Sequence, residues 1–504
     1  MTDSVATAKE HVDVLIVGAG LSGIGAGYHL QTNFPGKSYA ILEAREAIGG
    51  TWDLFRFPGV RSDSDMFTLG YHFRPWRSAK AIGDGQSILD YIQETASAYG
   101  IERKIRFNHR VVSAQWSTDE ARWTVTAERT DTGETVTFTA GFLFVCSGYY
   151  RYDQGYLPDF PGIDRFNGQI AHPQFWSDDV DYAGKRVVVI GSGATAVTMI
   201  PVMADAAEHV TMLQRSPSYI MSLPSEDPVA RVLRKILPAK LAYSIVRWKN
   251  VLFMMGIFQL SRRRPKAMKS LIRKAQEKAL PPGFDIDTHF NPSYDPWDQR
   301  MCLVPDNDLF ESIASGKVSV ATDRIKTFTE TGLELESGAH LDADLIVTAT
   351  GLNLLVLGGI ELSVDGDRVV VPESMSYKGV MLGGVPNFAF TFGYTNSSWT
   401  LRADLVSQYV CRLLEYMDSN GYRQCTPTNR DGSISTEPFI DLSSGYVTRA
   451  VSQFPRQGSR APWRQYQNYM LDLATLRYRP VDDGVLEFSG TATTPAQQPE
   501  QVAA

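Results

Sequence analysis

The stretch VDVLIVGAGLSGIGAGYHL at residues 12–30, followed by YAILEA at residues 39–44, decides the fold. The apolar run Val12–Val17 predicts a buried strand, the glycines after it predict a tight turn, and the next residues have the composition of a helix. The second apolar run, Tyr39–Ala44, predicts a second strand. This β-α-β pattern is typical of a doubly wound α/β nucleotide-binding fold.

The first glycine turn, Gly18-Ala-Gly20-Leu-Ser-Gly23, has the spacing of a pyrophosphate-binding loop. Glycines let the backbone bend and approach the pyrophosphate, and the N-terminus of the following helix presents N–H groups and the positive end of its dipole. Glu43 stands at the end of the second strand, about 20 residues after Gly23. A carboxylate there accepts from ribose hydroxyls and repels a 2′-phosphate, so we expect FAD or NAD at this site.

A second turn of the same kind follows in KRVVVIGSGATAV at residues 185–197, where Gly191 and Gly193 are followed by Thr195 and by alanine in place of the third glycine. Arg215 stands where the first site has Glu43. Arginine clamps a phosphate with two charge-assisted hydrogen bonds, so this position favours NADP over NAD.

The strand–turn–helix pattern thus restarts mid-chain, which indicates two nested doubly wound domains. Residues 107–140 alternate apolar and polar side chains, a period of two that predicts an antiparallel β-meander. Further buried strands are expected at Phe142–Gly148, His209–Ser216 and Leu341–Gly351. We expect a discontinuous FAD-binding domain (1–148 and 380–490), an NADP-binding domain (149–215 and 300–379), a helical insertion or cap (216–299) and a disordered tail (491–504).

Composition and charge exclude several classes of protein. The chain has 504 residues, 43% of them hydrophobic, which allows a large globular core. A net charge of −7 argues against nucleic-acid binding. The cysteines form no CxxC pair, so neither a redox dithiol nor a metal site is expected. The polar opening MTDSVATAKE has no apolar signal segment, and we expect a cytoplasmic protein.

Residues 228–276 differ from the rest of the chain. They have a helical pattern and contain about a dozen Lys and Arg but no Asp or Glu. Their apolar run Val251–Leu260 is shorter than the ~20 residues that span a bilayer. One interpretation is a helical cap over a substrate cavity. The other is a contact with anionic lipid at the inner face of a membrane.

The two turns together predict one flavin, which carries the chemistry, and one hydride donor, NADPH. Disulfide reductases and oxygenases share this plan. A disulfide reductase needs a dithiol beside the flavin, and the chain has no CxxC. Monooxygenases are therefore the leading class.

Between the two nucleotide units lies the segment Phe166-Asn-Gly168-Gln-Ile-Ala-His172-Pro-Gln-Phe-Trp176. Its spacing, F-x-G-x-x-x-H-x-x-x-W, resembles the fingerprint of type I Baeyer–Villiger monooxygenases. The related N- and S-oxidising flavin monooxygenases usually carry Tyr or Phe at the position of Trp176. We expect His172 to hydrogen-bond backbone and fix the linker, and Trp176 to anchor it against a domain.

Motifs that resemble this family extend from Val12 to about Phe488, and several resemble the subgroup that includes ethionamide-activating monooxygenases. One departure is Ser177, where the family often has Pro or Asp. The motifs are GGTW (49–52), FPGVRSDSD (57–65), QRSP (214–217), DQR (298–300), ATG (349–351) and GYTNSSWTLRADL (393–405).

The resemblance implies a catalytic arginine held by an aspartate near the flavin, and the matching residues are Arg300 in DQR and Asp63 in PGVRSD. Arginine does not deprotonate in proteins, so it can stabilise an anionic oxygen throughout the cycle. Arg61 and Asp65 stand in the same loop and compete for these roles. Cofactor contacts are expected from Gly18, Gly20, Gly23, Glu43, Trp52, Asp63, Gly191, Gly193, Thr195, Arg215, Gln299, Thr350 and Gly351. Because family members often have Lys where Gln299 stands, recognition of the 2′-phosphate falls mainly to Arg215.

The resemblance implies a flavin-dependent monooxygenase that uses NADPH and O2. Through a C4a-peroxyflavin it would insert oxygen next to a ketone carbonyl, giving an ester or lactone, and it would also oxidise sulfides or thiocarbonyls. The expected substrate is an apolar ketone or sulfide. Two alternatives stay open: an N- or S-oxidising flavin monooxygenase on the same scaffold, and a membrane-peripheral redox sensor that binds flavin without turnover.

Overall fold

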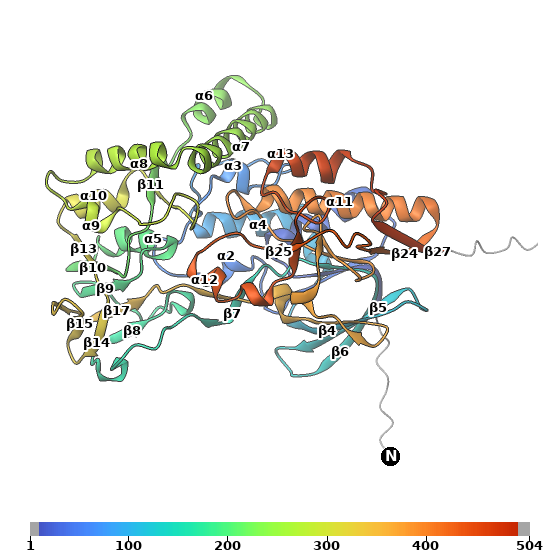
Figure 1. The fold of residues 1–504 in the computed structure, drawn as a ribbon, viewed down its shortest axis with the longest axis horizontal. Coiled ribbons are helices and arrows are strands. Elements are labelled where there is room, and N and C mark those ends of the chain that lie inside the picture. Colours follow the sequence, from blue (N-terminus) through green and yellow to red (C-terminus); the bar gives the residue numbers. More distant parts are fainter. Residues whose placement is uncertain (1–9, 492–504) are drawn as a thin grey trace, which may run out of the picture.

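The apolar run that opens the chain forms β1 (Glu10–Val17), an inner strand of the larger of the two main sheets in the computed structural model. Figure 1 labels strands β4, β5 and β6 of this sheet. The structure describes residues 10–491. β1 runs parallel to β2 (Tyr39–Leu42) on one side and to β6 (Thr135–Val145) on the other. A strand with parallel neighbours on both sides is buried on both faces, which explains its run of apolar residues. The sheet has the order β20-β19-β4-β5-β6-β1-β2-β3, with β23 also paired to β6.

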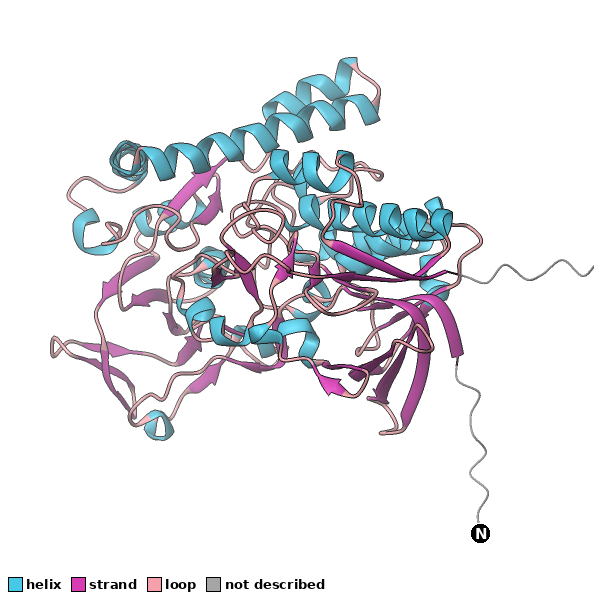
Figure 2. Cartoon of the chain, turned by 45° about the vertical axis from the view of Figure 1, so that its right-hand side comes forward, coloured by secondary structure: helices cyan, strands magenta, loops and turns pink. Residues whose placement is uncertain are grey.

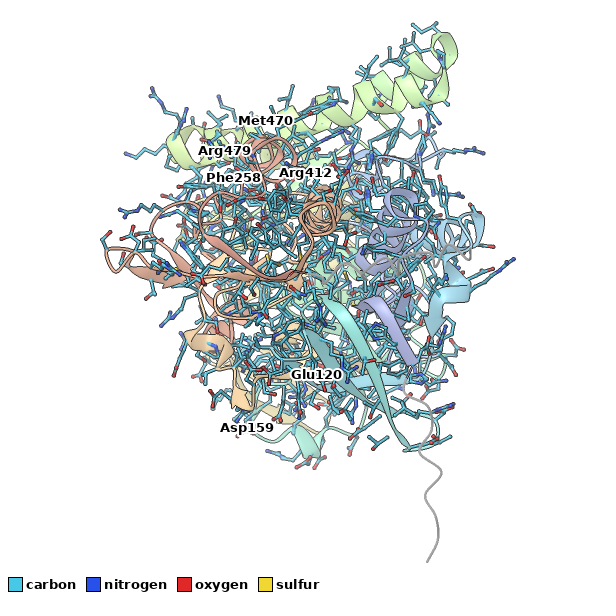
Figure 3. The ribbon with its side chains drawn as sticks, turned by 90° about the vertical axis from the view of Figure 1, so that its right-hand side faces the viewer. Glu120, Asp159, Phe258, Arg412, Met470 and Arg479 are labelled. Atoms are coloured by element: carbon cyan, nitrogen blue, oxygen red, sulfur yellow. The ribbon has the colours of Figure 1, made fainter. Side chains whose placement is uncertain are left out.

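The predicted meander is present as β4 (His109–Ser117), β5 (Arg122–Arg129) and β6, which pair antiparallel. Glu120, labelled in Figure 3, lies in the turn between β4 and β5. The two strands expected at the end of the meander and at Phe142–Gly148 are in fact one strand. β6 pairs with β5 over its first half and with β23 (Phe388–Phe390) over its second half, so it changes partner without a break.

The second sheet is entirely parallel, with the order β13-β10-β9-β17-β8. Its central strand β9 (Arg186–Ile190) is the strand that precedes the second glycine turn. The predicted restart of the doubly wound pattern is therefore confirmed, and the two sheets lie side by side (Figure 2). The other strands of this sheet are β8 (Gln169–Ala171), β10 (His209–Gln214), β13 (Val318–Thr322) and β17 (Leu345–Thr348).

Two antiparallel strands connect the sheets, β7 (Tyr150–Gly155) and β18 (Leu352–Leu354). After this return, β19 (Glu361–Val364) pairs with β4 of the larger sheet and β20 (Asp367–Arg368) extends it. These strands fall within the range expected for the NADP-binding domain. We therefore propose that the second unit ends before residue 361. The disordered tail was expected at residues 491–504, and all of these after Thr491 lie outside the described residues.

The predicted helical insertion is formed by α6 (Pro228–Ile236), α7 (Ala239–Arg263) and α8 (Pro265–Ala279). In Figures 1 and 2 these helices lie along one side of both units, and the α6–α7 hairpin stands out from the body. Arg247 anchors α7 on the first unit, because its guanidinium donates to the carbonyls of Phe67, Thr68 and Gly70 at 2.7–3.2 Å. No helix within residues 10–491 is long and apolar enough to cross a membrane.

The remaining elements are shorter or pack around these sheets. The helices are α1 (Leu21–Asn33), α2 (Thr51–Leu54), α3 (Met66–Leu69), α4 (Gly85–Ala98), α5 (Ala194–Met203), α9 (Ile286–His289), α10 (Asp308–Ala314), α11 (Trp399–Asn420), α12 (Gly445–Thr448) and α13 (Tyr469–Asp472). The strands are β3 (Ile105–Arg106), β11 (Ile220–Leu223) with β12 (Cys302–Pro305), β14 (Ile325–Thr329) with β15 (Gly332–Leu335) and β16 (His340–Asp342), β21 (Ser376–Tyr377) with β22 (Met381–Leu382), β24 (Tyr422–Pro427) with β27 (Leu486–Thr491), and β25 (Thr436–Pro438) with β26 (Arg456–Gly458).

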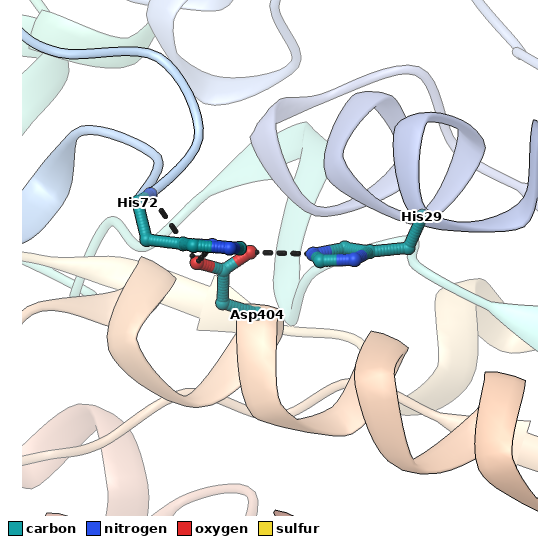
Figure 4. Close-up of side chains that lie close together, drawn as sticks. All are labelled: His29, His72 and Asp404. Atoms are coloured by element: carbon teal, nitrogen blue, oxygen red, sulfur yellow. Dashed lines mark hydrogen bonds and ion pairs between the residues drawn. The ribbon is translucent and has the colours of Figure 1, made fainter. Parts of the chain in front are cut away.

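A buried carboxylate ties three segments of the first unit together (Figure 4). Asp404 on α11 lies 2.8 Å from His29 Nε2 on α1 and 2.5 Å from His72 Nδ1 in the loop after α3. Burial raises the pKa of the Asp404 carboxyl, but the hydrogen bonds from the two histidines outweigh it and hold that pKa well below its usual range. These three side chains are close enough to ligate a metal ion. Arg247 Nη2, 4.0 Å from the carboxylate, disfavours a cation there, so we interpret the group as a hydrogen-bonded clamp.

Asp404→Asn is expected to lower the free energy of unfolding by roughly 3 kcal/mol, because it removes the carboxylate from a buried network. The loss should be full above about pH 4 and shrink as the pH falls, since a depressed folded pKa gives stability that is lost in acid. Urea denaturation at several pH values measures both effects. Asp418 lies on the same helix as Asp404 and forms an exposed ion pair with Lys37, so Asp418→Asn should cost less than about 1 kcal/mol. Equal losses in the two variants would contradict the clamp.

Candidate functional site

A single cavity of about 1170 Å³ lies between the two units and is lined by both glycine turns. It exceeds the roughly 300–1,000 Å³ of an ordinary small-molecule site. Nearly all the predicted cofactor residues line it: Gly18, Gly20, Glu43, Trp52, Asp63, Gly191, Gly193, Thr195, Arg215, Gln299, Thr350 and Gly351, together with Arg300. The carboxyl ends of β1 and β9 therefore face one shared space, as expected for ligands of doubly wound sheets.

The first turn has a backbone that only glycine permits. Gly18 has a φ of +102°, and a Cβ there would lie 2.7 Å from the carbonyl oxygen of Cys146. A Cβ on Gly23 would lie 1.8 Å from the carbonyl oxygen of Gly18. Gly23 does not line the cavity, so its contribution is the close packing of α1 on the turn. The turn and the N-terminus of α1 fit a pyrophosphate.

Glu43 lies directly after β2 and is buried. Its Oε2 accepts a hydrogen bond from Ala19 N at 2.7 Å, and its Oε1 accepts one from Arg45 N at 3.0 Å. Burial raises the pKa of the carboxyl, and these hydrogen bonds oppose the rise. Each oxygen retains a further lone pair, so the carboxylate fixed at the cavity wall can still accept from a ribose hydroxyl.

The second turn differs from the first at its third position. Gly191 has a φ of +136°, and a Cβ there would lie 2.3 Å from the carbonyl oxygen of Ala349. At Gly193 an added Cβ would meet no protein atom within 4 Å. Ala196 is fully buried, and its methyl is accommodated where Gly23 leaves no room in the first turn. Alanine therefore replaces glycine without loss of the turn.

Arg215 follows β10, is exposed, and lines the cavity beside the second turn. Arg324 lies on the same rim, at the end of β13, and was not predicted. Among the described residues neither guanidinium has an ion-pair partner within 4.0 Å. Gln299 also lines the cavity, but it carries no charge. Two arginines without a carboxylate partner form a binding surface that suits a phosphate.

Arg300 and Asp63 form an ion pair inside the cavity, with Nη2 2.6 Å from Oδ2. Asp63 comes from the loop before α3 and Arg300 from the segment before β12, so the pair joins the two units. The Asp63 carboxylate, more than any other neighbour, raises the pKa of the Arg300 guanidinium well above its ordinary value. About 30% of each side chain is exposed, and both line the cavity. The guanidinium is thus a permanent positive charge facing the ligand space.

The competing residues in the same loop have other partners. Arg61 Nη1 pairs with Asp308 at 2.5 Å. Asp65 caps α3 through Thr68 N at 3.0 Å and accepts from Asn250 on α7 at 2.8 Å. Both residues are occupied in holding the loop, which leaves Asp63 as the partner of Arg300.

Three tyrosines that the sequence analysis did not single out lie around Arg300. Tyr149, Tyr150 and Tyr446 line the cavity, and Tyr149 donates to the hydroxyl of Tyr150 at 3.2 Å. Burial raises the pKa of Tyr150 to about 12 and that of Tyr149 well above 10, so both hydroxyls stay protonated. Tyr149 and Tyr150 lie just before and at the start of β7, after the carboxyl end of β6, and this place in the sequence could have identified them. No local pattern marks Tyr446.

The fingerprint residues lie outside the cavity. His172 Nδ1 accepts from Gln174 N at 3.2 Å, and a Cβ on Gly155 would lie 2.3 Å from its ring, so it packs against β7. Burial lowers the pKa of His172, which fits a neutral structural imidazole. Trp176 packs beside Tyr182 with ring centroids 6.3 Å apart. Phe166 is buried, and a Cβ on Gly168 would lie 2.5 Å from its ring.

No residue of 228–276, the helical part of the insertion expected at 216–299, lines this cavity, although residues 216–218, Tyr294 and Gln299 at the two ends of that range do. The expected capping role therefore differs from what the structure shows, and an apolar substrate can no longer be argued from the composition of these helices.

Comparison with known proteins also indicates a nucleotide-binding flavoprotein. The model for flavin-binding monooxygenase-like proteins matches residues 83–357, more than half of the chain, and a model for NAD(P)-binding Rossmann-like domains matches residues 16–78. The FAD-containing monooxygenase EthA of Mycolicibacterium smegmatis is 56% identical over 481 residues, 95% of this chain and 97% of that protein. EthA of Mycobacterium tuberculosis is 53% identical over 95% of this chain and 98% of its own.

Solved structures share the fold. An oxidised steroid monooxygenase bound to NADP superposes with a TM-score of 0.70 at 25% identity, covering 83% of this chain and 88% of its own. An open structure of cyclohexanone monooxygenase has a TM-score of 0.73 at 22% identity, and the match covers 96% of this chain and 100% of that one.

These findings confirm the predicted α/β fold with Rossmann-like units and the predicted resemblance to the EthA subgroup. The predicted cofactors, FAD and NADP(H), are those named for these relatives and for the steroid monooxygenase. A redox sensor without turnover has no support among them. By its family match and by relatives that cover nearly its whole length, the chain belongs to the flavin-binding monooxygenase-like family and is a flavin-dependent monooxygenase.

Proposed function

We propose that this monooxygenase uses NADPH and O2 to carry out Baeyer–Villiger oxidation of ketones to esters or lactones, and that it also oxidises sulfides or thiocarbonyls. The observation that carries the proposal is the Arg300–Asp63 ion pair in a cavity lined by both glycine turns. FAD would bind at Gly18–Gly23 and NADPH at Gly191–Ala196. When bound, they supply hydride transfer and the activation of oxygen.

The surroundings of Arg300 suit an oxygen that carries negative charge. A peroxide anion and the oxyanion of a ketone adduct both need a positive partner that is fixed before the reaction. Arg300 supplies that charge, and Asp63 holds one edge of the guanidinium so that its other N–H groups are directed elsewhere. The neutral hydroxyl of Tyr150, which accepts from Tyr149, adds a donor without adding negative charge. The arrangement favours nucleophilic oxygen transfer to a carbonyl.

The alternative is an N- or S-oxidising flavin monooxygenase on the same scaffold. The description of the matching family model, flavin-binding monooxygenase-like, does not distinguish this class from the Baeyer–Villiger enzymes. An enzyme that selects amines would gain from a carboxylate free to pair with the substrate. Asp63 is paired with Arg300, and Glu43 is engaged by two backbone N–H groups. These engagements favour ketones and sulfur compounds over amines.

We further propose that Arg215 and Arg324 recognise the 2′-phosphate of NADPH. Both line the cavity beside the second turn. Gln299 also lines it but is uncharged, so the positive charge at this place comes from the two arginines. This proposal concerns the preference for NADPH over NADH and is independent of the oxidised substrate.

Arg300→Ala should abolish ester formation while NADPH is still consumed. Loss of a preorganised oxyanion partner costs about 10²- to 10³-fold in rate. The measurement is ester yield per NADPH by mass spectrometry with ¹⁸O-labelled O2 on matched ketone, sulfide and amine substrates. Arg56→Ala, an exposed arginine nearby that does not line the cavity, is the matched control. Wild-type enzyme that oxidises the amine but gives no ester would overturn the ketone proposal, and full ester yield in Arg300→Ala would remove Arg300 from the mechanism.

Arg215→Ala should raise the KM for NADPH by roughly 10- to 100-fold, because a hydrogen bond between charged groups is lost. The KM for NADH should change little. Steady-state oxidation of the two nucleotides measures the difference. An equal change in both KM values would show that Arg215 does not contact the 2′-phosphate.

Gly193→Val should weaken NADPH binding at least tenfold, about 1.4 kcal/mol, with flavin content and Tm unchanged. Its Cβ meets no protein atom, so the side chain enters only the space expected for the pyrophosphate. Fluorescence titration with NADPH measures the affinity. Gly191→Val is the contrasting variant and should lower the Tm, because its Cβ collides with Ala349. Unchanged affinity in Gly193→Val would place the nucleotide elsewhere.

A further inference from the structure

We infer that the α6–α7 hairpin is a docking surface for an anionic lipid bilayer, which it contacts from one side without crossing. The inference concerns a face remote from the cavity, so it does not depend on the reaction proposed above. Two observations carry it: an exposed apolar stripe on each helix, and an excess of positive charge in the segment that holds them.

The apolar stripe follows the helical repeat. On α7 the exposed side chains Leu241, Ile245, Trp248 and Leu252 are spaced alternately by four and three residues, which places them on one face. On α6 the exposed Val229, Val232 and Ile236 have the same kind of spacing. The exposed fractions reach 58% at Val232, 69% at Ile236 and 56% at Leu252. Amphipathic stripes normally face a protein core, but these face outward.

Exposed apolar side chains are concentrated in this part of the molecule. Of the 19 exposed large hydrophobic residues among the described ones, ten lie within residues 228–276. Helix α13 continues the surface, because Tyr469 packs beside Trp248 with ring centroids 5.8 Å apart and the next two residues, Met470 and Leu471, are exposed. Figure 3 shows Met470 just below the helices of the insertion. Single exposed hydrophobic residues are ordinary, but a continuous patch marks an interaction surface.

Positive charge surrounds the stripe. Residues 228–276 carry 13 Lys and Arg and no Asp or Glu, a charge of +13. Because the whole chain has a net charge of −7, the remaining residues carry a net charge of −20. Several of these cations pair with acids outside the segment. Lys235, Lys240, Arg263, Arg264, Lys266 and Lys274 are exposed and have no ion-pair partner within 4.0 Å among the described residues. Lys235 and Lys240 flank the α6–α7 turn, whereas Arg263 and Arg264 lie at the other end of α7, roughly 37 Å away at about 1.5 Å per residue.

The distribution of charge favours an anionic bilayer over a second copy of the chain as the partner of this surface. An apolar stripe with cations at both ends of the helix fits a bilayer, where the stripe enters the headgroup region and the cations contact lipid phosphates. A second copy of the chain would bring two strongly positive segments together. The acidic remainder of the molecule is repelled by an anionic surface, so the same charge distribution would orient this face toward the lipid.

The test is co-sedimentation of the flavin-loaded protein with phosphatidylcholine vesicles that contain or lack phosphatidylglycerol. Wild type should sediment with the phosphatidylglycerol vesicles and be released as salt is raised. Ile236→Glu/Leu252→Glu should reduce the partition coefficient at least tenfold, because two apolar contacts are lost and two negative charges gained. Both positions are exposed and lie outside the cavity, so flavin absorbance and circular dichroism should be unchanged.

The matched control is Thr132→Glu/Val370→Glu, which adds the same charge at exposed positions outside the insertion. It should sediment as wild type does. Failure of wild type to sediment with phosphatidylglycerol vesicles would overturn the inference, as would equal loss in the two double variants. Light scattering that shows a wild-type dimer which Ile236→Glu/Leu252→Glu converts to a monomer would assign the surface to a second copy instead.

Discussion

Two carbonyl oxygens approach two turns so closely that only glycine fits, and the rest of the site depends on this constraint. The oxygen of Cys146, at the end of the strand next to β1, closes on Gly18, and that of Ala349, after the strand next to β9, closes on Gly191. Each approach turns the backbone sharply at the carboxyl end of a central parallel strand. It thereby points the N-terminus of a helix at the space beyond, where a pyrophosphate is favoured.

Because the two units face each other across one cavity, residues far apart in sequence meet. Asp63 comes from the first unit and Arg300 from the second, and their ion pair closes the gap between them. We propose that this pair holds the guanidinium where a flavin bound to one unit and a nicotinamide bound to the other would come together. β7, which with β18 connects the units, is tied to the fingerprint segment by hydrogen bonds from the Gln174 side chain to the carbonyls of Arg151 and Tyr152. The fingerprint residues thus contact the connection between the units and do not line the cavity.

The local sequence pattern predicted those residues of the site whose positions are determined within one strand–turn–helix unit. Gly18, Glu43, Gly191 and Arg215 all follow from spacing, because a turn and the end of the next strand are set within about 25 residues. Arg300 and Asp63 required a resemblance to a family, since their contact spans the two units. Arg324 and Tyr446 were missed because nothing local brings them to the cavity. The expectation that residues 228–276 cap the cavity has no support in the structure, since none of them lines it. Their helices were predictable, but the face on which they pack depends on Arg247 and its distant carbonyl partners.

The central claim is that one cavity holds both nucleotides with Arg300 between them. A crystal structure with FAD and NADP⁺ bound tests it most directly. We expect one pyrophosphate at residues 18–23, the other at residues 191–196, and the Arg300 guanidinium in contact with the nicotinamide or the flavin ring while still paired with Asp63. Either nucleotide bound outside the cavity, or Arg300 turned away from both rings, would contradict the account.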